Sequence, residues 1–100
     1  MLYTRIDKWL WAARFYKTRS LAKTSLENGK VKIDGQKVKP SRSIEIGEKI
    51  HIKQGDIDRV IVVSGLSEQR RGAPEAQKLY QETQESIQRR EKLSAERKAF

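Results

Sequence analysis

The uneven distribution of large apolar side chains is the feature that most limits what this chain can fold into. Of its 23 Leu, Ile, Val and Phe residues, 19 lie within residues 1–66 and four within residues 67–100. The first two thirds can therefore build a small core, whereas the last third buries too little apolar surface to fold alone. We expect one domain over residues 1–66, followed by a linker and a C-terminal helix over residues 67–100 that docks on it.

Composition excludes several classes of protein. The chain has no cysteine and one histidine, His51, which rules out disulfides, thiol chemistry and a structural zinc site. It has no apolar run near the ~20 residues of a membrane span and no secretory signal pattern at its N-terminus. A basic, tryptophan-containing start also occurs in transit peptides and membrane-surface helices, but a folded domain explains these residues better. We expect a cytoplasmic protein with no cofactor, no metal and no membrane partner.

Positive charge is concentrated in the same N-terminal region. The net charge is +9, from 22 Lys and Arg against 13 Asp and Glu. Residues 1–42 contribute +8, residues 43–66 contribute −1 and residues 67–100 contribute +2. Strongly basic domains are typical binders of polyanions, and a charge that served solubility alone would be spread evenly. The distribution predicts a nucleic-acid-binding surface built by residues 1–42.

Two short helices are expected first. Thr4 and Asp7 match a capping box, and an apolar stripe of helical periodicity continues to about Tyr16. Thr18 is the next candidate N-cap, and Gly29 suits the left-handed position that ends a helix. The sequence thus predicts two helices joined by a tight connection.

The pattern then changes to the two-residue period of β-strands. Residues 31–33 alternate between apolar and basic, and Asp34-Gly35 is a typical two-residue hairpin turn. His51 alternates with two isoleucines and is expected to be exposed. Asp56 and Asp58 are interpreted as a polar turn rather than as a metal or acid–base pair. Residues 59–66 are the most β-branched segment and the expected central strand.

The C-terminal third has the composition of a helix. Arg70-Arg71-Gly72 is typical of a linker, and residues 75–98 contain strong helix formers with no Gly or Pro. We expect one long, mostly solvated helix. Its first turns should dock on the core through the stripe formed by Leu79, Tyr80 and Ile87.

Trp11 and Phe15 lie one helical turn apart, away from the main apolar stripe of the first helix. Aromatic side chains interleaved with cations often stack on unpaired bases. The C-terminal helix, however, needs an apolar surface on which to dock. Packing beneath that helix is therefore favoured, with base stacking as the alternative.

Four lysines are expected on one face of the hairpin. With Asp34-Gly35 as the loop, Lys32 faces Lys37 and Lys30 faces Lys39. Directly opposed like charges destabilise a sheet by roughly 0.2–1 kcal/mol per pair, which favours an anion bound against the cluster. A solvated lysine face is the alternative.

The connection between the helices is equally suited to phosphate. Lys17-Thr18-Arg19-Ser20 combines two cations, two hydroxyls and the free N–H groups of a helix N-terminus. Together with the hairpin, it predicts nucleic-acid binding. The candidate nucleic-acid-binding residues are Arg5, Lys8, Arg14, Lys17, Thr18, Arg19, Ser20, Lys23, Lys30, Lys32, Lys37 and Lys39.

Residues 5–10, 18–22 and 29–35 resemble, in order and spacing, the RNA-binding domain named after ribosomal protein S4. Residues 7–19 further resemble the bacterial heat-shock protein 15 family, and the similarity continues through Arg89-Arg90-Glu91-Lys92. The resemblance implies an α+β fold of S4 type, with its αL motif. In that fold two short helices pack against a small, mostly antiparallel sheet, and here a long C-terminal helix would follow.

The same resemblance implies a ribosome-associated RNA-binding protein and not an enzyme. Members of the family bind large (50S) ribosomal subunits that carry a nascent chain attached to tRNA, and they assist rescue and recycling after heat stress. The expected partners are ribosomal RNA, the large subunit and the tRNA of a stalled chain, bound by a monomer. The family's further basic tail does not follow Phe100 in this sequence.

Two other functions are weighed against this one. The first is an RNA- or DNA-binding accessory protein that is not tied to the ribosome. The second is an RNA-modifying enzyme, because some pseudouridine synthases begin with a domain of this kind. The 34 residues after residue 66 are too few to supply the catalytic domain of such an enzyme.

Overall fold

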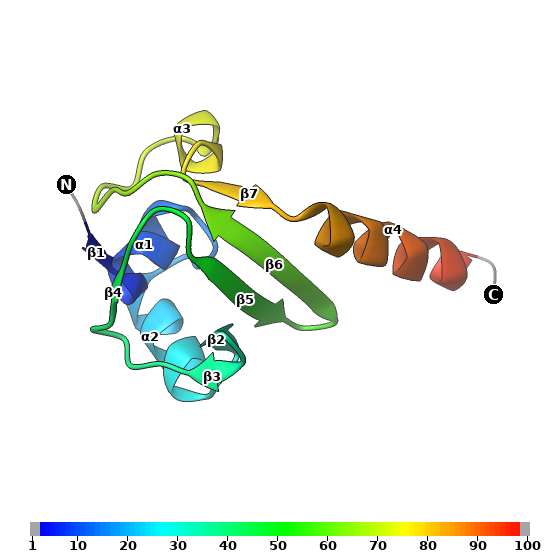
Figure 1. Cartoon of the computed structure of the whole chain (residues 1–100), viewed down its shortest axis with the longest axis horizontal. Helices are drawn as coiled ribbons and strands as arrows, with labels where there is room; N and C mark the ends of the chain where they lie inside the picture. The colour runs from blue at the N-terminus through cyan, green and yellow to red at the C-terminus, as the bar shows by residue number, and fades with distance from the viewer. Residues whose placement is uncertain (1–2, 99–100) are drawn as a thin grey trace.

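The alternating segments in the middle of the chain form a five-stranded antiparallel sheet in the order β3-β2-β5-β6-β7 (Figure 1). The structure is a computed structural model and describes residues 3–98. The strands are β2 (Val31–Ile33), β3 (Gln36–Lys37), β5 (Lys49–Gln54), β6 (Ile57–Val63) and β7 (Tyr80–Glu82). A separate two-stranded ribbon pairs β1 (Thr4–Arg5) with β4 (Ser43–Ile44).

Helices α1 (Ile6–Ala12) and α2 (Arg19–Glu27) bury their apolar sides against this sheet. Side chains of both helices form one core cluster with alternate residues of β2, β5 and β6. Trp9 is fully buried in it. Its indole Nε1 donates a hydrogen bond to the carbonyl of Gly65 at 2.8 Å, so the polar atom of the buried ring is satisfied. This is the α+β arrangement that the sequence predicts.

The hairpin turn at Asp34-Gly35 is confirmed. Both residues have left-handed backbones, with φ of 54° and 73°, as a type I′ turn requires. Lys32 pairs with Lys37 as expected. The ladder between β2 and β3 ends there, so the hairpin is shorter than predicted. On its other edge β2 pairs with β5, where Val31 faces Ile52 and Lys32 faces His51.

The capping box expected at the start of the first helix is wrong. Thr4 lies in β1 opposite Ile44, and the N-cap of α1 is Arg5. Asp7 instead accepts hydrogen bonds from the Arg5 guanidinium at 2.9 and 3.1 Å. The helix also ends at Ala12, earlier than predicted, and Arg14 shortly after it has a φ of 64°. A left-handed backbone cannot continue an α-helix.

The predicted boundaries of the second helix are confirmed. The Thr18 hydroxyl oxygen accepts a hydrogen bond from the backbone N–H of Leu21 at 3.1 Å. Gly29, just after the helix, has a φ of 72°, which is the left-handed conformation expected of a C-terminal glycine.

A long C-terminal helix is confirmed, but it does not begin at residue 75 as expected. The chain instead forms α3 (Ala73–Gln77), then strand β7, then α4 (Gln84–Lys98). Residues 80–82 complete the sheet because β6 offers an open edge of N–H and C=O groups. Leu79 and Tyr80 pack against the core, whereas Ile87 lies in α4, so the three residues do not form one helical stripe.

Helix α4 is attached to the domain near its start and extends away from it (Figure 1). The carboxylate of Glu82 in β7 accepts hydrogen bonds from the Arg90 guanidinium at 2.6 and 2.9 Å and from the Ser86 hydroxyl at 2.6 Å. The hydrogen bond from Arg90 is the main cause that holds the pKa of Glu82 below its usual value. No helix within residues 3–98 is long and apolar enough to cross a membrane.

Candidate nucleic-acid interface

The connection between α1 and α2 presents an exposed group of basic and hydroxyl side chains. Lys17, Thr18, Arg19 and Ser20 are all exposed, and so is Lys23 one turn along α2. None of the five ion pairs found in the described part of the chain involves these cations. Thr18 uses its hydroxyl oxygen to cap α2. This connection therefore offers cations to a ligand rather than to the protein's own carboxylates.

The segment expected to be a linker holds this connection in place. Arg70 donates from one guanidinium nitrogen to the carbonyls of Trp11 and Tyr16, both at 2.8 Å. Its guanidinium also lies 5.9 Å from the centre of the Trp11 ring, within cation–π range. The Gln54 side chain of β5 donates to the carbonyl of Phe15 at 2.6 Å. These bonds fix the backbone that leads to Lys17.

Arg14 also contributes to this scaffold. Its guanidinium donates to the backbone carbonyl of Arg71 at 2.9 Å. Arg14 thus ties the end of α1 to the segment before α3, and it is not wholly free for RNA. The partners of Arg14 and Arg70 are more than 50 residues away in the sequence, which is why sequence patterns did not reveal these contacts.

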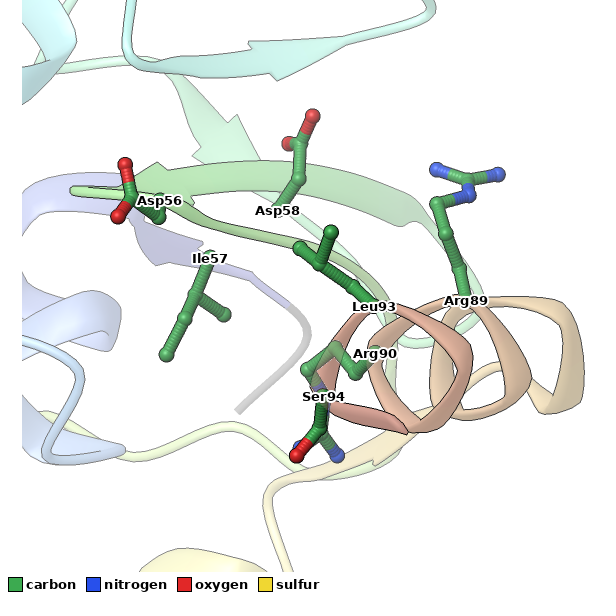
Figure 2. Close-up of a pocket in the computed structure, with 7 residues that line it drawn as sticks. All are labelled: Asp56, Ile57, Asp58, Arg89, Arg90, Leu93 and Ser94. Atoms are coloured by element: carbon green, nitrogen blue, oxygen red, sulfur yellow. The ribbon is translucent and has the colours of Figure 1, made fainter. Parts of the chain in front are cut away.

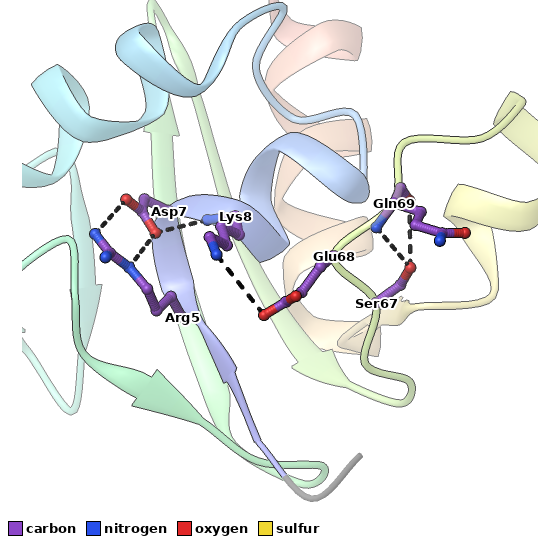
Figure 3. Close-up of polar contacts among 6 residues, drawn as sticks. All are labelled: Arg5, Asp7, Lys8, Ser67, Glu68 and Gln69. Atoms are coloured by element: carbon purple, nitrogen blue, oxygen red, sulfur yellow. Dashed lines mark hydrogen bonds and ion pairs between the residues drawn. The ribbon is translucent and has the colours of Figure 1, made fainter.

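Arg5 and Lys8 at the start of α1 are partly engaged within the protein (Figure 3). Arg5 forms an ion pair with Asp7 at 2.9 Å, and the Lys8 ammonium lies 4.0 Å from Glu68. The Lys8 and Glu68 side chains are 30% and 44% exposed, and exposed ion pairs typically stabilise a fold by about 0–1 kcal/mol, so Lys8 can turn to a phosphate at little cost. The Arg5 side chain is 45% exposed, but its partner Asp7 is only 5% exposed, and breaking this pair would leave a buried carboxylate without its cation. Arg5 is therefore held mainly within the protein.

The four hairpin lysines are all exposed but divide between two pockets. Lys30 and Lys32 line a shallow pocket of about 420 Å³ together with Lys53 of β5. Lys37 and Lys39 line a second one of about 510 Å³ beside the end of α2. Lys53 is a basic residue that the sequence analysis missed. Its alternation with His51 placed it on the outer face of a strand, but only the pairing of β5 with β2 brings it to Lys30.

His51 and Asp58 form a hydrogen-bonded pair across β5 and β6. Asp58 is therefore a strand residue with a defined partner and not part of a solvated turn, and His51 is half-buried rather than fully exposed. Among the described residues, no three His, Asp or Glu side chains converge on a point that could hold a metal. The pair borders the lysine-lined surface, because His51 faces Lys32 in the sheet.

The packing interpretation of Phe15 is confirmed, although its partner is a strand rather than a helix. Phe15 is only 8% exposed. Its ring lies 4.6 Å from that of Tyr80 in β7 and 6.0 Å from that of Trp9, between centroids. Trp11 is half-buried beside Arg70. The aromatic pair thus belongs largely to the fold.

A further pocket of about 300 Å³ lies between the start of β6 and α4 (Figure 2). Its lining residues are Asp56, Ile57, Asp58, Arg89, Arg90, Leu93 and Ser94. The strand side contributes two carboxylates and Ile57, and the helix side contributes two arginines, Leu93 and Ser94. This mixture of charges does not select for phosphate, and we assign the pocket no part in RNA binding.

Comparison with known proteins places these features in a family. Residues 4–50 match the family model described as S4 domain. The chain is 53% identical over 94 residues to Heat shock protein 15 homolog of Haemophilus influenzae, covering 94% of this chain and 72% of that protein. It is 33% identical over 51 residues to RQC P-site tRNA stabilizing factor of Listeria innocua, covering 51% of this chain and 55% of that protein.

A solved structure gives the same result for the whole fold. The structure of Vibrio cholerae Heat Shock Protein 15, described as trimeric, matches with a TM-score of 0.94 and 54% identity. The match covers 98% of this chain and 99% of that one.

Proposed function

Because the chain belongs to the heat shock protein 15 family, we propose that it is a non-catalytic, ribosome-associated protein that binds ribosomal RNA in the cytoplasm. The observation on which this rests is the group of exposed cations at the start of α2, without ion-pair partners among the described residues. Arg70 and Gln54 hold the backbone behind them. A binding surface that is already ordered loses less entropy when RNA binds.

The finer proposal concerns the ribosomal state. We assign the protein to large (50S) subunits that carry a nascent chain attached to tRNA, where it assists rescue and recycling. The partial similarity to a protein named for P-site tRNA stabilisation supports a contact with tRNA. The alternative is an RNA- or DNA-binding accessory protein without a ribosomal role. Sedimentation of a lysate through a sucrose gradient separates the two, because only the ribosomal protein should travel with large subunits.

Binding should depend steeply on salt. If roughly 5 phosphates are neutralised, the logarithm of the association constant should fall against the logarithm of salt concentration with a slope of about −3.5 to −4.5. Filter binding of the protein to large subunits across a salt series measures this slope. A slope near zero would remove the electrostatic basis of the proposal.

We expect the free protein to be a monomer of 11.6 kDa. Among the described residues, the exposed large apolar side chains come from separate segments of the chain, whereas stable interfaces between subunits have an apolar core. Light scattering coupled to size exclusion gives the mass directly. A mass near three chains would instead match the trimer described for the Vibrio cholerae relative.

A further inference from the structure

The outer face of the sheet carries a pocket lined by three lysines from two strands and their ends. In β2 the residues on either side of Lys32 are buried. In β5 Ile50 and Ile52 are buried and the next residue, Lys53, is exposed. The alternating lysines therefore point away from α1 and α2. The lining residues are Asn28, Gly29, Lys30, Lys32, Lys53 and Gly55. They include no carboxylate.

Backbone pairing brings these lysines together. The N–H of Lys53 donates to the carbonyl of Lys30 at 2.8 Å, which continues the ladder in which Lys32 faces His51. Gly29 and Gly55, at the two ends of the pocket, have φ of 72° and 58°. Other residues rarely adopt these conformations. Both chain reversals that shape the pocket therefore depend on glycine.

The charges in the pocket have no counter-ion among the described residues. None of the ion pairs involves Lys30, Lys32 or Lys53. The nearest acid in the register is Asp58, which faces Lys53 across β5 and β6, but its carboxylate is bonded to His51. Like charges held on neighbouring strands destabilise a sheet, and a bound anion would relieve that repulsion.

We propose that this pocket binds a backbone phosphate of the RNA and that Lys53 is a direct contact to it. The inference rests on the proposed function and extends it. Lys53 lies outside residues 4–50, which match the S4 domain, so the contact widens the binding surface beyond that region. The phosphodiester fits the site because three ammonium groups can surround its oxygens without any base-specific contact.

The test compares Lys53→Gln with Lys49→Gln in filter binding to large subunits. Both variants lose one positive charge from the same face of β5, but Lys49 does not line this pocket. Loss of one phosphate contact should reduce the salt slope by about 0.7–0.9, which corresponds to about five- to eightfold weaker binding at 0.1 M salt. Lys49→Gln should change affinity less than about twofold, the effect of a distant charge under screening. Lys53→Arg keeps the charge and should keep the slope.

The outcomes distinguish this inference from the proposed function. If Lys53→Gln and Lys49→Gln bind equally, with the steep slope of the parent protein, the phosphate site is wrong and RNA binding stands. If the parent protein itself shows no salt dependence, the proposed function is refuted, whatever the lysine variants do. Replacing chloride with inorganic phosphate at constant ionic strength tests the other source of the anion. If millimolar phosphate raises the melting temperature of the parent but not of Lys53→Gln, while Lys53→Gln and Lys49→Gln bind large subunits equally, the pocket binds free phosphate and not the RNA, and our assignment is overturned.

Discussion

Reversing two charges at the start of α2, with Lys17→Glu and Arg19→Glu, should abolish association with large ribosomal subunits. Two phosphate contacts would be lost, which alone weakens binding by at least about 25-fold at 0.1 M salt, and two carboxylates would then repel the RNA. Both side chains are exposed and lack ion-pair partners among the described residues, so the melting temperature should hardly change. Co-sedimentation with purified subunits and thermal melting by circular dichroism measure the two effects.

The matched control is Arg89→Glu with Lys92→Glu on α4. Both residues are exposed, and the change in net charge is the same. This control should retain most of its affinity, because α4 lies far from the start of α2 (Figure 1) and the pocket that Arg89 lines also contains two carboxylates. Equal loss in both double variants would mean that net charge, and not the start of α2, governs binding. Continued co-sedimentation of a folded Lys17 and Arg19 variant would refute the site.

The parts of the fold that the sequence predicted correctly have local causes. The turn at Asp34-Gly35 and the end of α2 at Gly29 both need a left-handed backbone. Glycine adopts this conformation readily, so its presence in the sequence predicts both features. The cap at Thr18 is also decided within three residues. In contrast, the predicted cap at Thr4 does not form, because Thr4 lies in β1 and pairs with Ile44 of β4, which is distant in the sequence.

The C-terminal third shows why local propensity was insufficient. Residues 75–98 favour a helix throughout, yet residues 80–82 become a strand. The hydrogen bonds of the open β6 edge and the burial of Tyr80 against Phe15 outweigh that propensity. Neither partner can be identified from the sequence around residue 80. Composition also predicts that this segment cannot fold without the core, and that stays a prediction.

In the candidate interface, too, only the residues whose positions depend on local patterns could be predicted from the sequence. Strand alternation placed Lys30 and Lys32 on an outer face, and the cap at Thr18 placed Lys17 and Arg19 at a helix start. The contribution of Lys53 depends on which strand lies beside β2, and that of Arg70 depends on two carbonyls in a loop far along the chain. Both positions depend on tertiary contacts, which the periodicity of the sequence does not predict.

Phe15→Ala should cause the largest loss of stability. The ring is nearly buried between Trp9 and Tyr80, and truncation of a buried Phe to Ala typically lowers the free energy of unfolding by about 3–5 kcal/mol. A small domain has a total of about 5–15 kcal/mol. Urea unfolding followed by circular dichroism gives the difference. Tryptophan emission should also shift to the red, because the cavity loosens the packing around Trp9.

The comparison with Trp11→Ala decides between packing and base stacking for the aromatic pair. Trp11 is only half-buried and contacts Arg70, so Trp11→Ala should lower the free energy of unfolding less than Phe15→Ala does. If the pair serves the fold, Phe15→Ala measured well below its new melting temperature should bind RNA with nearly the parent's affinity. Base stacking requires the reverse pattern. In that case Phe15→Ala and Trp11→Ala would each weaken binding by about five- to 150-fold, since each stacked base contributes about 1–3 kcal/mol, while the urea midpoints would stay near that of the parent.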